Sequence, residues 1–309
     1  MFFQKSIDSD NYCCNNDVYD LNEKFENFKY FFNICKKFQV NLNYSERYFR
    51  NYFDNKVNYS LLVTFNQIPI EENIILIKKL YQDYFQNILF CGKNILKFLN
   101  KFRGNRKYFD EYTFIEYDTK DGFYHYFCLT KSIEINLNTN GYFLMSDDVL
   151  IKYWTFSKLD SNKIWFPVYL YLNETHRQRN RWFRWTNAEK SMNLVFKYLN
   201  KKSKELDLND ENFEILREIK SNLDFNKESK INEFQILKYW SDFYYLPRSK
   251  FNKFHLLSNI LRKYDTFLEV AVPFILSALD YYNETQILNG IYYWEPNRYN
   301  FMVTLGKDY

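Results

Sequence analysis

The chain of 309 residues is 46% hydrophobic and 26% charged, which is enough to bury one large core or two smaller ones. Its formal net charge of +4 and pI near 8.5 are only mildly basic. This balance argues against a nucleic-acid partner and is compatible with a small anionic substrate. No run reaches the ~18 apolar residues of a membrane span, and the N-terminus lacks the apolar core of a signal peptide. We therefore expect a soluble chain without an anchor, so that a cytoplasmic location stays open.

The composition limits what short patterns can show. The chain holds 29 Tyr and 32 Phe beside only 6 Gly and 5 Pro, and it is rich in Asn. Aromatic clusters and glycosylation sequons arise by chance in such a sequence. Sequons such as those that begin at Asn58, Asn173 and Asn283 therefore do not indicate a secretory route by themselves.

The cysteines follow no recognisable pattern. There are five of them, an odd number, and no CxxC pair occurs. This arrangement predicts neither a zinc site nor a disulfide framework. Cys91 and Cys128 stand in apolar surroundings, so we expect both to be buried thiols.

The first segment, residues 1–56, is polar, aromatic and uneven, with a helical pattern over 22–38. We interpret it as a variable N-terminal extension, followed by one domain over 57–309. The domain opens with a β-prone run at 60–65, a helix at 71–84 and a strand at 87–92. A second unit follows, with a strand at 114–118, a helix at 123–137 and a strand at 142–145.

The remaining elements are mostly helical. We predict strands at 164–168 and 241–247, and helices at 188–201, 211–223, 251–264 and 267–282. Two successive β-α-β units indicate a parallel sheet with crossover helices. The predicted fold class is therefore α/β: a three-layer, open and mostly parallel sheet with flanking helices and a helical C-terminal half.

One stretch, GYFLMSDDVLIKYW at 141–154, joins a buried strand to two adjacent carboxylates, Asp147 and Asp148. Ligands of open α/β sheets bind beyond the carboxyl ends of the strands, where this pair is expected. Two hard oxygen donors there suit Mg²⁺ or Mn²⁺. The competing interpretation is a helix cap or turn, because Ser146-Asp147-Asp148 is also good capping chemistry.

Other candidate groups lie farther along the chain. Arg177, Arg179 and Arg181 form a basic loop that could hold a diphosphate or could be a solvated loop. Glu269 stands alone in an apolar run, so it is either a general base facing a cleft or a partnered structural carboxylate. Asp242, before a short apolar strand, is in a similar position.

Several reaction classes are excluded by missing motifs. The chain has no GxGxxG or GxxxxGK[ST] phosphate loop and no GxSxG elbow. Its histidines, His125, His176 and His255, form neither a triad nor a metal-binding pattern. We expect His125, inside an aromatic helix, to be structural.

Three blocks of the sequence stand out together. The first holds Asp147, Asp148, Tyr153, Trp154, Lys163, Ile164 and Trp165. The second holds Ser241, Asp242, Tyr244, Tyr245 and Pro247, and the third holds Val270 to Pro273 and Asp280. These blocks resemble the corresponding segments of the STELLO-type glycosyltransferases of plants and nematodes. They keep the family order and span about residues 59–295.

The resemblance implies an A-type glycosyltransferase fold. Asp147 and Asp148 would bind Mn²⁺ or Mg²⁺ and the diphosphate of a nucleotide-sugar donor, and the acceptor would be a carbohydrate or glycoconjugate. Such enzymes usually lie in the Golgi as type II membrane proteins, whereas this sequence carries no anchor, and its acids are a contiguous pair. Asp242 and Glu269 are the candidates for the base, and the three arginines could assist the diphosphate. The alternative is a catalytically inactive relative that acts as a scaffold or binding protein.

Overall fold

The structure describes most of the chain between residues 57 and 288. The computed structural model describes residues 57–66, 71–94, 113–151, 153, 156, 159–167, 183–205, 211–225 and 239–288. All of them belong to the unit Val57–Gly290. The predicted N-terminal extension, with its helix at 22–38, lies outside the described residues.

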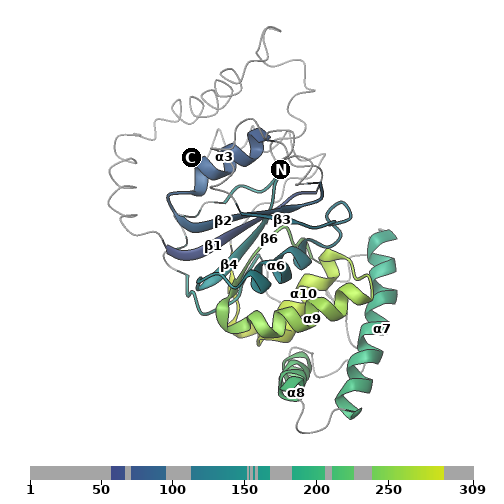
Figure 1. The fold of residues 1–309 in the computed structure, drawn as a ribbon. Helices are drawn as coiled ribbons and strands as arrows, with labels where there is room; N and C mark the ends of the chain where they lie inside the picture. Colours follow the sequence, from purple (N-terminus) through teal and green to yellow (C-terminus); the bar gives the residue numbers. More distant parts are fainter. Residues whose placement is uncertain are drawn as a thin grey trace, which may run out of the picture. The chain divides into compact units, whose positions relative to one another are not determined.

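A mixed seven-stranded sheet is the centre of this unit (Figure 1). Its strands are β1 (Val57–Thr64), β2 (Phe85–Gly92), β3 (Thr113–Glu116), β4 (Gly141–Ser146), β5 (Trp165–Phe166), β6 (Phe243–Pro247) and β7 (Gln286–Ile287). Their order is β3-β2-β1-β4-β6-β5-β7. Strands β1 to β4 are parallel, β6 pairs antiparallel with β4 and β5, and β7 is parallel to β5. The predicted α/β class is confirmed.

The burial of the strands explains why the sequence forms them. Strand β4 has neighbouring strands on both edges and is buried at every position. Its sequence is therefore a continuous apolar run. The outer strand β3 is mostly exposed and buries only Ile115 fully. The centre of the sheet is thus specified by hydrophobicity, and its edge is specified only weakly.

Helices cover both faces of the sheet. Helix α3 (Glu71–Tyr81) lies on one face, and α6 (His125–Ile135), α9 (Phe251–Lys263) and α10 (Leu268–Leu279) lie on the other (Figure 1). Helices α7 (Phe183–Glu205) and α8 (Glu211–Phe225) pack outside them, against α9 and α10. No helix in the described ranges has the length and apolar character required to cross a bilayer.

The face of the sheet that α3 covers carries an aromatic cluster. The ring of Phe143 in β4 lies 4.7 Å from Tyr245, 5.0 Å from Phe156 and 5.1 Å from Trp165, measured between centroids. Tyr59 of β1 joins the same cluster through edge contacts. Such contacts add to the area that the rings bury, so part of the aromatic excess has a structural role.

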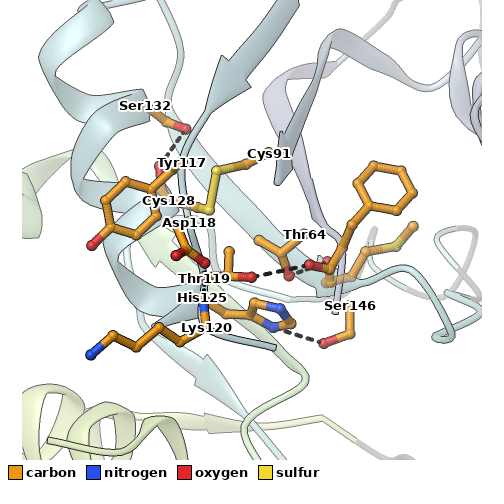
Figure 2. The surroundings of a disulfide bond; sticks show 12 residues. Thr64, Cys91, Tyr117, Asp118, Thr119, Lys120, His125, Cys128, Ser132 and Ser146 are labelled. Carbon is orange, nitrogen blue, oxygen red and sulfur yellow. Dashed lines mark hydrogen bonds between the residues drawn. A yellow bond between two sulfur atoms is a disulfide. The ribbon is translucent and has the colours of Figure 1, made fainter. Parts of the chain in front are cut away.

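A disulfide joins the sheet to the opposite helix layer and corrects the sequence prediction. Cys91 at the end of β2 is bonded to Cys128 of α6, with a Cα–Cα distance of 6.0 Å (Figure 2). Both residues are fully buried, so burial was predicted correctly, whereas the expectation of two thiols was wrong. The partners lie 37 residues apart and follow no spacing rule. Only the packing of α6 on β2 brings them together.

Candidate functional site

The acidic pair lies where β4 ends beside β1. The Asp147 N–H donates to the carbonyl oxygen of Thr64 over 2.9 Å, and the Asn66 N–H lies 3.5 Å from Asp147 Oδ1. Residues 147 and 148 form a turn, in which the Val149 N–H donates to the Ser146 carbonyl oxygen over 3.0 Å. The turn that the sequence allows is therefore present, and it holds the two carboxylates at the carboxyl end of a central strand.

This end of the sheet is a topological switch point. From β1 the chain moves outward through β2 to β3, and it then returns to place β4 on the other side of β1. The helix that follows β1, α3, lies on one face of the sheet, and α6, which leads into β4, lies on the other (Figure 1). Open α/β sheets bind ligands beyond the carboxyl ends of the strands at such a switch point, and there Asp147 of the β4 end contacts Thr64 and Asn66 at the end of β1.

Asp242 brings a third carboxylate to this place. Its carbonyl oxygen accepts the Ser146 N–H over 2.8 Å, which continues the pairing of β4 with the approach to β6. Its side-chain Oδ1 accepts the Ser146 hydroxyl over 3.2 Å. The structure therefore brings Asp242, a predicted site residue, next to the strand that carries the acidic pair.

The charge of Asp148 acts on both Asp147 and Asp242. Burial first, and then the charge of Asp148, raise the pKa of Asp147 to about 6, while the Asn66 N–H opposes the shift. Burial and then Asp148 also raise the pKa of Asp242 to about 6, against the Ser146 hydrogen bond. Among the described residues none of the three forms an ion pair. Like charges held together in this way favour protonation or a bound cation.

His125 is linked to this cluster through Ser146. It is the first residue of α6, and its Nδ1 lies 3.4 Å from the Ser146 hydroxyl oxygen (Figure 2). Both residues are fully buried. Burial lowers the pKa of His125 to about 4, so the ring is neutral at pH 7. The buried chain His125–Ser146–Asp242 spans three separate segments, and nothing in the sequence spacing indicates it.

The loop between β3 and α6 supports the end of β1. Lys120, Asp121 and Gly122 have φ values of 47°, 53° and 87°, all in the left-handed region. A Cβ added to Gly122 would lie 2.2 Å from the side-chain oxygen of Asn66 and 3.5 Å from Cε1 of His125. Only glycine permits this close approach, which places the loop against two residues of the site.

Glu269 occupies a neighbouring position without joining the aspartates. It lies in the first turn of α10 and is 7% exposed. The Leu268 N–H donates to the Phe123 carbonyl oxygen over 3.0 Å, and the Glu269 carbonyl oxygen accepts the Tyr239 N–H over 2.9 Å. These bonds attach the start of α10 to the loops around the site. No hydrogen bond in the described part of the chain joins Glu269 to the aspartates.

Two further predictions concern the basic loop and the metal site. Arg177, Arg179 and Arg181 lie outside the described residues, as does His176. Within the described ranges, no group of three or more His, Cys, Asp or Glu side chains is close enough together to hold a metal ion. The side chains described at this site therefore do not form an all-protein metal cage.

Comparison with known proteins identifies the family. The sequence model of the STELLO glycosyltransferases matches residues 16–242. The match contains Asp147, Asp148 and Asp242 and ends before Glu269. No curated protein and no solved structure shows a significant match. Because the matched residues make up well over half of the 309-residue sequence, the chain belongs to the STELLO glycosyltransferase family.

Proposed function

We propose that this protein transfers a sugar from a nucleotide-diphosphate donor to a carbohydrate or glycoconjugate acceptor with the help of Mn²⁺ or Mg²⁺. The main support for the proposal is the position of Asp147 and Asp148 at the neighbouring carboxyl ends of β1 and β4. The mixed open sheet with this acidic end supports an A-type glycosyltransferase fold. Family membership supports the sugar donor and the acceptor.

The residues present fit a divalent ion that is shared with a substrate. Mg²⁺ is usually held by one or two carboxylates together with substrate phosphates, so a cage of three protein groups is not required. Asp147 and Asp148 would hold the ion. When bound, the metal would neutralise charge on the diphosphate leaving group. Burial first, and then the charge of Asp148, raise the pKa values of Asp147 and Asp242, so a nearby cation would favour their ionised carboxylates.

The other carboxylates have roles in the acceptor half of the site. Asp242 is held by the Ser146 hydroxyl and can orient an acceptor hydroxyl or take its proton. Its raised pKa brings it closer to the value that a base needs at neutral pH. Glu269, buried at the start of α10, is the second candidate for the base. Arg177, Arg179 and Arg181 would assist the diphosphate.

The disulfide bears on where the reaction takes place. Disulfides persist in oxidising compartments and are rare in the cytosol. The buried Cys91–Cys128 bond therefore supports a lumenal location such as the Golgi, in agreement with the family.

Calorimetry with UDP and GDP, each with and without Mn²⁺, tests the proposal. We expect nucleotide binding that needs Mn²⁺ and weakens at least tenfold, or about 1.4 kcal/mol, in Asp148→Ala. Asp83→Asn is the matched control, because Asp83 is an exposed acid in the turn before β2, at the opposite edge of the sheet. Mn²⁺-dependent binding that Asp148→Ala leaves unchanged would exclude the assigned site.

A catalytically inactive relative is the second candidate. The observation that favours it is the lack, within the described residues, of three grouped metal-binding side chains. Such a protein could bind a nucleotide sugar without transferring the sugar. Assays of donor hydrolysis and transfer with a panel of UDP- and GDP-sugars separate the two, since only the enzyme releases the nucleoside diphosphate.

A further inference from the structure

The structure distinguishes two of the four glycosylation sequons in the sequence. Each has the form Asn-X-Ser/Thr without proline, which is the acceptor pattern for N-linked glycans. Asn43 and Asn173 lie outside the described residues, whereas Asn58 and Asn283 both lie within them. Their surroundings differ in the property that decides whether a folded chain can carry a bulky glycan: access to the side-chain amide nitrogen.

Asn283 is exposed on a surface turn. It lies in the short 3₁₀ helix η5 (Tyr282–Glu284) between α10 and β7. The Glu284 carboxylate pairs with Lys163 Nζ over 2.9 Å, and the Gln286 N–H donates to the Ile164 carbonyl oxygen over 2.8 Å. These bonds fix the turn to the start of β5 without using the Asn283 side chain. The Asn283 side chain thus lies exposed on a turn that is held in place by its neighbours.

Asn58 is half-buried, and its side chain is engaged with a neighbouring segment. It lies in β1, where its Nδ2 is 3.5 Å from the Asn140 side-chain oxygen and its Oδ1 is buried. Its carbonyl oxygen accepts the Asn140 N–H over 2.7 Å and the Thr139 hydroxyl over 3.2 Å. The third residue is buried in both sequons, so the difference lies at the asparagine: Thr285 is 6% exposed, and Ser60 is fully buried and accepts a hydrogen bond from Asn87. A glycan on Asn58 would have to displace the connection between α6 and β4.

We propose that Asn283 is an acceptor site for an N-linked glycan and that Asn58 is not. The Cys91–Cys128 disulfide supports folding in an oxidising compartment, where such glycans are added. In the reaction, Asn283 Nδ2 forms a bond to C1 of a lipid-diphosphate-linked oligosaccharide. The bond between C1 and the diphosphate breaks, the lipid diphosphate leaves, and the transferring enzyme takes the proton from Nδ2.

Asn58 stays unmodified in the native protein because of the folding equilibrium. The sequon can be reached while the chain is unfolded, but a glycan at Asn58 is incompatible with the pairing of β1 described above. Chains modified there would be retained as misfolded protein. The proposal concerns a surface turn outside the acidic site, so it stands or falls independently of the glycosyl-transfer proposal.

Production of the full chain in a eukaryotic secretory host, behind a cleavable leader, tests the site. The folded fraction is treated with peptide N-glycosidase in ¹⁸O water and mapped by mass spectrometry, which marks each formerly glycosylated Asn as labelled Asp. We expect the label at Asn283 and unmodified Asn58. Asn283→Gln should remove one glycan from the intact mass, and the matched control Asn58→Gln should remove none.

Two results would overturn the proposal. One is an unlabelled Asn283 in folded wild-type protein, and the other is a labelled Asn58 in that fraction. Thr285→Val provides a second variant, because it keeps Asn283 but destroys the sequon. Loss of the label at Asn283 in that variant supports enzymatic N-glycosylation, whereas persistence of the label there would contradict it.

Discussion

Removal of the Cys91–Cys128 disulfide should lower the free energy of unfolding by about 4 kcal/mol. The bond closes a loop of 37 residues, and the chain-entropy relation for a loop of that length gives about 4 kcal/mol at 25 °C. Both cysteines are buried between β2 and α6 in the folded protein. The variants are Cys91→Ala, Cys128→Ala and the double substitution.

The double-mutant cycle gives this prediction a distinctive signature. Either single substitution already breaks the bond, so the double variant should lose about as much stability as each single one, rather than the sum. Urea unfolding followed by tryptophan fluorescence measures the three values, and non-reducing peptide mapping identifies the linked peptides. Small losses that add up, or alkylation of both cysteines in the native wild-type protein, would refute the reasoning.

Three further predictions concern the site. Ser146→Ala should cost about 1–3 kcal/mol of unfolding free energy, measured with urea, because the buried Asp242 carboxyl loses its hydroxyl donor; an unchanged midpoint would contradict that contact. Gly122→Ala should cost about 1–3 kcal/mol for the left-handed φ of 87° alone, and more from the clash with Asn66; thermal melts check it, and wild-type stability would refute it. The raised pKa values of Asp147 and Asp242 mean that the folded protein binds more protons than the unfolded chain between the ordinary aspartate value of 3.8 and about 6. Metal-free stability should therefore gain up to about 1.4 kcal/mol per group for each pH unit as the pH falls through this window. Urea titrations from pH 7 to 5 should show a weaker slope in Asp147→Asn than in the wild type, and equal slopes would contradict the assigned shift.

The central strand could be predicted from the sequence because local physics alone specifies it. Strand β4 is buried on all sides and reads as an unbroken apolar run. The abrupt change to two carboxylates marks its end, and the order of β-α-β units places that end at the ligand-binding edge. Helix α10 was predicted as well, although Pro273 lies within it and the helix ends at Leu279 instead of residue 282.

The features that sequence reasoning missed depend on contacts between distant segments. Strand β7 has only two residues and forms by pairing with β5, so no periodicity indicates it. The disulfide and the link from His125 to Ser146 both require α6 to pack on the sheet. His125 was predicted to be structural, and its burial agrees with that. Its contact with Ser146 also links it to Asp242, because the Ser146 hydroxyl contacts both side chains. A contact between residues 96 positions apart, such as Ser146 and Asp242, cannot be predicted from a single sequence.

The manganese affinity of the protein in saturating UDP or GDP shows whether Asp147 and Asp148 hold the ion. Electron paramagnetic resonance of free Mn²⁺ measures it without any requirement for turnover. If Asp147 and Asp148 hold the ion together with the diphosphate, the wild type and Asp83→Asn should bind one Mn²⁺ with the same Kd. Asp147→Asn and Asp148→Asn should each raise that Kd at least tenfold. Wild-type affinity in both variants, or no nucleotide-dependent manganese binding in the wild type, would contradict the account.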